Sequence, residues 1–221
     1  MNESTTPGRI TRIERQVRRR ERISIWIDDE FAFGIAEETW VRFSLVTGRT
    51  LSADEISGIR EWDEIYQAKQ TGMRYLERRR RSRQEIRQRL VEKEYSEPAI
   101  EEAIRFLEEY GMVDDEAFAR AWVHDRLLRK KVGRRKLASE LSSKGIDREL
   151  VSNVLAEVLD IETARGHAME AARGKERRLR KSDPMARERS MVTFLQSRGF
   201  GWEEIRPVLE QLREEWRDEN G

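Results

Sequence analysis

Residues 134–158 read RRKLASELSSKGIDRELVSNVLAEV, and the spacing of the apolar residues in this stretch decides the fold. Leu137 and Leu141 are four residues apart, which places both on one face of a helix. Further along the stretch, gaps of four and three residues give a second helix one apolar face. The segment between them, Lys144-Gly-Ile-Asp147, has the composition of a turn and ends on a residue suited to an N-cap. The stretch therefore predicts two helices joined by a tight turn.

The same spacing of apolar residues occurs three times along the chain. In each copy, six apolar positions follow one another with gaps of 4, 5, 5, 4 and 3 residues, and shifts of 51 and then 54 residues bring the copies into register. The eighteen positions are Ile86, Leu90, Tyr95, Ile100, Ile104, Leu107, Leu137, Leu141, Ile146, Val151, Leu155, Val158, Met191, Leu195, Phe200, Ile205, Leu209 and Leu212. An internal repeat of this length is typical of tandem helical modules, each of which buries a narrow apolar stripe against its neighbours.

The turns within the three helix pairs differ at one position. Gly145 and Gly199 occupy it in the second and third copies, whereas Glu94 occupies it in the first. Glycine adopts a positive φ angle readily and glutamate does not, so we expect the first turn to lack a positive φ. Helix N-caps are expected at Ser96 and Asp147.

A third helix is expected after the first and second pairs. Asp114-Asp115 and Glu162 provide the acidic residues that favour such helix starts. After the last pair the chain continues only with Trp216 and polar residues, so the third unit is expected to lack this helix. With this division, the predicted helical repeats cover residues 82–131, 132–184 and, truncated, 185–221.

Alternating apolar residues near the amino terminus predict strands. Ile23, Ile25 and Ile27 keep a period of two, Asp28-Asp29-Glu30 provides a turn, and the period resumes at Phe31. We therefore predict a β-hairpin within a small subdomain over residues 1–50.

Two capping boxes predict where helices begin after this subdomain. Ser52-Ala-Asp-Glu55 predicts the start of a long connecting helix within residues 51–81, and Ser82-Arg-Gln-Glu85 predicts the start of the next helix. The fold class is thus mainly α: tandem three-helix repeats in an elongated array, preceded by a small β-hairpin subdomain.

The composition restricts the possible functions. Apolar residues make up 37% and charged residues 39% of the chain, against about 45–50% and about 25% in ordinary globular domains. The chain has no Cys, which excludes disulfides and thiolate metal sites. It also has no apolar run long enough for a signal sequence or a membrane-spanning helix, so we expect a cytoplasmic protein that does not enter membranes.

Motifs for catalysis or cofactor binding are absent from the sequence. It contains no G-x-x-x-x-G-K-[ST] loop, G-x-S-x-G elbow or H-E-x-x-H pair. The two histidines, His124 and His167, lack flanking metal ligands, and the Asp114-Asp115 pair is explained more simply as a helix N-cap. We therefore expect no enzyme activity, metal or cofactor.

The net charge of +1 conceals strong segregation of charge along the chain. Basic residues concentrate in segments 9–22, 74–93, 126–136 and 173–189, and the third of these holds seven cations and no acid. Segment 94–117 instead holds nine acids and one Arg. The helical basic segments surround the expected openings of the first helix of each pair, which favours a stripe that contacts a polyanion. The candidate contact residues are Arg78, Arg79, Arg81, Arg87, Lys130, Lys131, Arg134, Arg135, Lys136, Arg177, Arg178 and Arg180.

A second interpretation of these cations remains open. They could form a solvated surface that pairs with the many nearby Glu residues. The segment of seven cations argues against this reading because it contains no acid as a local partner. In the same way, the acidic segment is either a docking face or a solvated helix face.

The tryptophans suggest a stacking role on single-stranded nucleic acid, although packing in the core is the default for this residue. Trp26 lies on the hairpin face opposite to Ile25 and Ile27, and it is the candidate for an exposed contact. We expect Trp122 and Trp202 to pack within the helical repeats.

Together these motifs resemble the RecX family, the bacterial regulators of the RecA recombinase. The resemblance rests on the order and spacing of Ile10-Thr-Arg-Ile13, the hairpin 24–34, Tyr75-Leu-Glu-Arg-Arg-Arg-Arg-Ser82, Val113-Asp-Asp-Glu-Ala-Phe-Ala119 and residues 133–146. It implies a curved array of three tandem three-helix repeats that lies along the RecA–DNA filament. It also implies restraint of the recombinase, ATPase and co-protease activities of RecA, and so a role in DNA repair, recombination and the SOS response.

Two other functions remain possible from the sequence. The helix pairs could bind duplex DNA directly, although the acidic second helix of the first pair, with Glu97, Glu101 and Glu102, disfavours this. The protein could also be an interaction scaffold without a nucleic-acid role. The expected partners are the RecA filament and, through phosphates, single- or double-stranded DNA, and the expected oligomeric state is a monomer.

Overall fold

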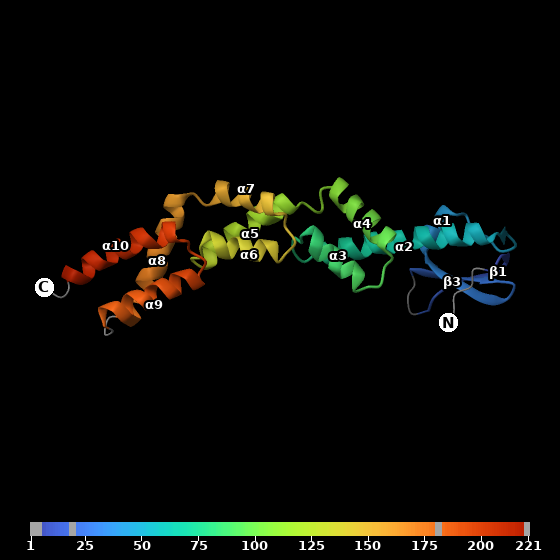
Figure 1. Cartoon of the computed structure of the whole chain (residues 1–221). Helices are drawn as coiled ribbons and strands as arrows, with labels where there is room; N and C mark the ends of the chain where they lie inside the picture. The colour runs from blue at the N-terminus through green and yellow to red at the C-terminus, as the bar shows by residue number, and fades with distance from the viewer. Residues whose placement is uncertain (1–5, 18–20, 180–182, 219–221) are drawn as a thin grey trace. The chain divides into compact units, whose positions relative to one another are not determined.

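The computed structural model describes residues 6–17, 21–179 and 183–218. Within these residues it contains four strands and ten helices (Figure 1). The chain divides into two compact units, the first formed by residues 1–80 and 86–113 and the second by residues 81–85 and 114–221. The predicted mainly α fold with a small N-terminal strand subdomain is confirmed.

Four antiparallel strands open the first unit, in the spatial order β3-β2-β1-β4. They are β1 (Gly8–Arg15), β2 (Arg22–Ile27), β3 (Glu30–Ala36) and β4 (Thr50–Leu51), with the short helix α1 (Glu37–Arg42) after β3. The predicted hairpin is β2 and β3, which pair Ile23 with Ile35 and Ile25 with Phe33. The period of two in the sequence thus becomes one buried face of the sheet.

The long helix α2 (Ala53–Leu76) covers this buried face with its first turns. Both hydrogen bonds of the predicted capping box between Ser52 and Glu55 are present, which confirms the predicted helix start. Ile56 and Ile59 of α2 pack with the isoleucines of β1, β2 and β3 in one buried cluster. Trp26 lies on the opposite face, as expected.

The second half of α2 packs with α3 (Arg83–Val91) and α4 (Glu97–Glu109) to form a first helical module. Gly72 of α2 is buried there, and a Cβ atom at this position would stand 2.7 Å from Cδ1 of Leu107. The glycine that weakens the helical pattern of the sequence therefore permits α2 and α4 to approach closely.

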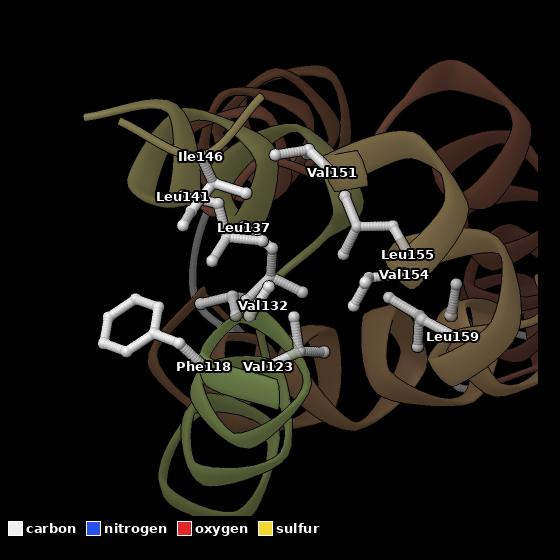
Figure 2. Packing of buried hydrophobic residues seen from close by; sticks show 12 residues of the cluster. Phe118, Val123, Val132, Leu137, Leu141, Ile146, Val151, Val154, Leu155 and Leu159 are labelled. Carbon is white, nitrogen blue, oxygen red and sulfur yellow. The ribbon is translucent and has the colours of Figure 1, made fainter. Parts of the chain in front are cut away.

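The second unit contains two further modules of the same kind. One consists of α5 (Asp115–Arg129), α6 (Arg134–Ser142) and α7 (Arg148–Val158), and the other of α8 (Ile161–Leu179), α9 (Pro184–Ser197) and α10 (Trp202–Asp218). Figure 2 shows how side chains from α5, α6 and α7 meet in the buried cluster of the second module. A separate cluster unites α8, α9 and α10.

The burial of the repeated apolar positions confirms the repeat. Of the eighteen positions, Tyr95 and Val158 are half-buried and all the others are buried. Every copy of the spacing therefore supplies the core of its own helix pair.

The grouping of helices differs from the expected repeat boundaries. The sequence suggested that each pair packs with the long helix that follows it, whereas the buried clusters join each pair to the long helix that precedes it. Phe118 and Val123 of α5, for example, pack with Leu137 and Leu155. The last pair has α8 in this role and so is a complete three-helix module. The apolar spacing of a pair does not indicate which flanking helix covers it.

The three turns share one backbone conformation, including the first. The φ angles are +63° at Glu94, +77° at Gly145 and +84° at Gly199. In each turn the next residue donates its amide to a helical carbonyl, as Tyr95 does to Leu90 and Ile146 does to Leu141. Our expectation that the first turn lacks a positive φ was wrong. The unpaired carbonyls of the helix end need these donors, and this need outweighs the roughly 1–2 kcal/mol that glutamate costs in this conformation.

The second and third turns each contact the start of the middle helix in another module. Within the second unit, Ser82 Oγ donates to the carbonyl of Lys144 at 2.7 Å, just before α3 begins. At the equivalent place before α6, the Gly133 amide donates to the carbonyl of Arg198 at 3.0 Å. The same kind of contact between a turn and a helix start therefore recurs along the chain.

The predicted N-caps behave differently from one another. Asp147 accepts hydrogen bonds from the amides of Glu149 and Leu150, as expected. Ser96 occupies the N-cap position of α4 but accepts no helical amide, and its hydroxyl instead bonds Glu64 at 2.7 Å.

Candidate functional site

The predicted basic residues surround the starts of the middle helices of the three modules. Residues 77–82 connect α2 to α3, residues 130–133 connect α5 to α6, and Arg177 and Arg178 end α8 ahead of α9. Arg180 lies outside the residues that the structure describes. The structure thus places the remaining candidates where the sequence predicted, in each unit separately.

The first unit holds three candidates with different surroundings. Arg78 and Arg79 are exposed in the connection after α2. Arg87 on α3 is half-buried and forms ion pairs with Glu97 at 2.7 Å and Glu101 at 2.8 Å, both on α4. The acidic helix therefore neutralises Arg87, and part of the acidic segment has a partner inside its own module.

Internal partners also neutralise much of the basic segment 126–136 in the second unit. Arg126 donates through Nε to Glu140 at 2.6 Å, Arg129 pairs with Asp125 and Lys131 pairs with Glu170. Arg134 donates to a backbone carbonyl at the end of α7. Our argument that this segment has no local partners was therefore wrong. Asp125 stands four residues before Arg129 on α5, a spacing that the sequence shows, whereas Glu140 and Glu170 come from α6 and α8 and are not identified by the local sequence.

The Arg126–Glu140 pair is the most buried of these interactions. The Arg126 guanidinium, through its hydrogen bonds, holds the pKa of Glu140 below its ordinary value, and a further bond from the Trp122 indole acts in the same direction. Glu140 is therefore ionised at neutral pH, and Arg126 serves the packing of α5 on α6.

Three cations of this segment remain available to a ligand. Lys130, Arg135 and Lys136 form no ion pair with any residue that the structure describes, and Lys130 and Arg135 are exposed. Within the same described part of the chain, the exposed Arg177 and Arg178 also lack an ion pair. Arg135 and Lys136 lie in the first turn of α6, where a cation does not stabilise the helix because the positive end of the helix dipole lies there. Lys130 is instead the C-cap of α5, and Arg177 and Arg178 lie in the last turn of α8, where cations favour the helix end.

Protein groups already occupy backbone donors at these helix starts. The amides of Gly133 and Arg135 donate to the carbonyls of Arg198 and Gly199, and Asp115 accepts from the amide of Arg83 at 2.8 Å. A helix start with free amides would bind an anion directly. Here the contact to an anion depends on the side chains.

The tryptophans differ from the expectation in one case. Trp122 packs against the core of the second module, as expected. Trp26 is half-buried, with the Arg12 guanidinium 3.8 Å above its ring. Trp202 is 57% exposed at the start of α10, so our expectation that it packs was wrong. The first helical residue after a glycine N-cap position can point away from the core, which the apolar spacing did not reveal.

The histidines fit a structural role. His124 is exposed, whereas His167 is half-buried and burial lowers its pKa. Among residues 6–17, 21–179 and 183–218, no group of three His, Asp or Glu side chains could hold a metal ion. In the same part of the chain, none of the helices is both long and apolar enough to cross a bilayer.

A four-stranded sheet followed by tandem three-helix modules, with exposed cations in and beside the connections to the middle helices, defines a class of modular, mainly helical protein. Comparison with known proteins identifies the family. Four family models match the chain in order: the Regulatory protein RecX N-terminal domain over residues 8–52, and the first, second and third three-helix domains of RecX over residues 68–107, 114–155 and 166–209. These ranges follow the same grouping of helices as the buried clusters.

Curated relatives and solved structures agree with this match. The chain is 31% identical over 206 residues to Regulatory protein RecX of Clostridioides difficile (strain 630), covering 93% of the chain and 96% of that relative. It is 30% identical over 208 residues to that of Clostridium acetobutylicum, covering 92% and 95%. A crystal structure of regulatory protein RecX matches with a TM-score of 0.74 and 25% identity, over 92% of this chain and 99% of the other. The structure of RecX from Lactobacillus salivarius, at 20% identity and a TM-score of 0.65 over 68% of this chain, shares the fold. The chain belongs to the RecX family of regulatory proteins.

Proposed function

We propose that this RecX-family chain binds the RecA–DNA nucleoprotein filament and mainly inhibits its recombinase, ATPase and co-protease activities. It acts in the cytoplasm by binding, without catalysing a reaction. The observation that carries the proposal is a set of cations without internal ion pairs in the second unit, at the end of α5, the start of α6 and the end of α8: Lys130, Arg135, Lys136, Arg177 and Arg178. Other cations of the same segments form ion pairs within the modules, whereas these five do not, so their charges are available to a ligand.

The physical basis is the release of counterions from a polyanion. Each DNA phosphate that a protein cation neutralises lowers the logarithm of the binding constant by about 0.7–0.9 for each tenfold increase in salt. Arg78 and Arg79 of the first unit are exposed and are proposed as further contacts. Arg81, Arg87, Lys131 and Arg134 contribute less, because each is half-buried and the last three have internal partners.

The first experiment measures the single-stranded-DNA-dependent ATPase of RecA from the same organism, titrated with this protein at two salt concentrations. We expect inhibition at fewer than one molecule per RecA protomer, with weaker inhibition at the higher salt concentration. No effect of the folded protein at saturation, with RecA active, would contradict the proposal. Inhibition that does not depend on salt would instead support an interaction scaffold.

A charge-reversal variant tests the residues. Lys130→Glu, Arg135→Glu and Lys136→Glu together should weaken inhibition at least tenfold, since the three cations lack internal ion pairs. The matched control reverses Arg148, Arg165 and Arg206, which lie on α7, α8 and α10 and change the net charge equally. Equal losses in both variants would show an effect of net charge only and would contradict the assignment.

A further inference from the structure

The exposed Trp202 lies next to the cations that the proposed function uses. It is the first residue of α10, it is 57% exposed, and it directly follows the turn that docks on the start of α6. In the part of the chain that the structure describes, its indole makes no ring stacking or cation–π contact. An indole of this size in water has no role in the core of its module.

The docking of the turn brings Arg135 next to Gly201, the residue that precedes Trp202. The amide of Arg135 donates to the carbonyl of Gly199 at 3.1 Å. Its guanidinium Nε lies 3.7 Å from the point where a Cβ atom on Gly201 would stand, and Gly201 is the residue before Trp202. Lys136 packs against the same turn, with its Cα 2.9 Å from the corresponding point on Gly199. Backbone contacts thus fix the turn that precedes Trp202 against the two residues of α6 that carry cations without ion pairs.

The two acids that follow Trp202 differ in their surroundings. Glu204 is 4% exposed and accepts the hydrogen bond from the Gly201 amide that begins α10. Glu203 is exposed on the next position of the helix and forms no ion pair with a described residue. The Glu204 carboxylate is thus bonded inside the turn, and Glu203 is the exposed carboxylate next to Trp202.

These features favour one class of ligand. A cationic side chain of a protein partner would be attracted to the indole, but Arg135 and Lys136 repel it. An apolar protein surface would need several neighbouring apolar side chains that are exposed. Among the described residues of this turn and helix start, only Trp202 is large, apolar and exposed. A nucleotide of a single strand carries a flat base that stacks on an indole and a phosphate that a cation binds. In a duplex the bases are already stacked and cannot reach the ring.

We propose that Trp202, Arg135 and Lys136 form a binding site for one nucleotide of single-stranded nucleic acid. The base stacks on the Trp202 indole while the flanking phosphates contact Arg135 and Lys136. This inference rests on the proposed function only in its use of the basic start of α6 as the surface that contacts anions. Its test does not involve RecA, so the two proposals can fail separately.

The test measures binding of the full chain to a fluorescein-labelled oligothymidylate by anisotropy at several salt concentrations. Trp202→Ala should weaken binding about tenfold at every salt concentration, since stacking of one base contributes on the order of a tenfold or larger change in affinity and depends little on salt. Arg135→Ala should weaken binding and also reduce the salt slope by about 0.7, because it removes one phosphate contact. The different salt dependence of the two variants separates stacking from charge.

Two controls make the result specific. Tyr110→Ala removes another exposed aromatic ring, which is 67% exposed in the acidic segment of the first unit, and should leave the affinity unchanged. Trp202→Phe keeps a smaller aromatic ring and should give an intermediate affinity, which also covers the case in which the alanine variant is poorly folded. Binding to a duplex of the same length should not respond to either change at Trp202.

Photocrosslinking locates the contact independently. An oligonucleotide with 5-bromouracil should crosslink to the peptide that contains Trp202 under long-wavelength irradiation. Unchanged affinity of folded Trp202→Ala and Trp202→Phe, or crosslinks confined to other peptides, would overturn the site. Absence of any binding to single strands by a protein that still inhibits the RecA ATPase would overturn the nucleotide site and leave the proposed function standing.

Discussion

The first and second turns of the repeat have the same backbone and opposite surroundings. Both have a positive φ and the same hydrogen bonds to the end of the preceding helix. Glu94 is exposed and lines a polar cleft of about 650 Å³ in the first unit, together with residues of α2 and β3. Gly145 instead packs on Gln84 in the second unit, where a Cβ atom would stand 2.7 Å from Cγ of Gln84.

The difference shows that the helix end by itself does not require glycine at this position. Glu94 completes the same turn with an ordinary side chain, at a cost in backbone energy. What requires glycine is the docking of the turn on a helix start, which leaves no room for a Cβ atom. The side chain at this position therefore distinguishes a turn that docks within the chain from one that faces solvent.

The largest expected effect comes from Gly145→Ala. The substitution combines a strained φ with overlap on Gln84, so we expect a loss of roughly 2–5 kcal/mol in the free energy of unfolding, measured by urea denaturation. Gly111→Ala is the matched control, since Gly111 has a φ of +64° and nothing within 4 Å of its added Cβ atom. It should lose only about 1–2 kcal/mol. Equal losses at the two glycines would show that docking does not restrict the second turn.

A smaller effect is expected from the lysines that precede the two turn positions. Lys144 Nζ bonds Glu85 at 2.9 Å, with side-chain exposures of 18% and 17%, and lies 4.4 Å from the Trp122 ring centroid. Lys144→Met should cost about 2 kcal/mol, because it removes the ammonium group that bonds a largely buried carboxylate. Lys93→Met should change stability by less than about 0.5 kcal/mol, as at other exposed positions. A thermal denaturation series of the two variants checks this, and similar melting temperatures would contradict it.

Glu94→Gly should stabilise the protein by about 1 kcal/mol. Glycine removes the strain of the positive φ at an exposed position, and part of this gain is offset by its greater freedom in the unfolded chain. Glu94→Ala keeps the strained backbone and should leave the urea midpoint close to that of the original protein. A glycine variant no more stable than the alanine variant would show that the first turn is not strained.

The smallest expected effect is a change in the pH dependence of stability, and it concerns a histidine of the third module. Burial lowers the pKa of His167 on α8, so its neutral form is favoured in the folded state. Its contribution to stability is therefore complete above the ordinary pKa of about 6.5 and is lost as the pH falls through the lower folded value. His167→Gln should narrow the difference in melting temperature between pH 7.5 and pH 5, relative to the original protein. An unchanged difference would exclude this role for His167.

The sequence predicted those parts of the fold that depend on local patterns. The apolar spacing located the buried positions, and the Ser52 and Ser82 capping boxes located two helix starts, because these signals involve residues a few positions apart. The packing of the long helices was not accessible in this way. Whether α5 covers the pair before it or after it depends on contacts between residues such as Val123 and Leu155, which are far apart in the chain.

The sequence predicted where the candidate site lies, but it did not predict which of its cations lack an ion pair. The basic segments mark the helix starts, since clustering of Arg and Lys is visible in the sequence. Which cations remain without an ion pair depends on acids brought in from other helices, such as Glu140 for Arg126 and Glu170 for Lys131. The exposure of Trp202 depends in the same way on the direction in which α10 begins, and no local pattern encodes it.

The contact between Gly133 and Arg198 restricts how a chain of this kind can change its number of modules. Loss of the last module, by an early stop codon or a deletion, would remove the acceptors for the amides of Gly133 and Arg135 and uncover a helix start that has no side-chain cap. A shortened descendant would therefore gain stability from a Ser, Thr or Asp at position 133, whose side chain would replace part of the lost hydrogen bonding. Module number in such a lineage is thus coupled to the identity of a single residue in the module that remains.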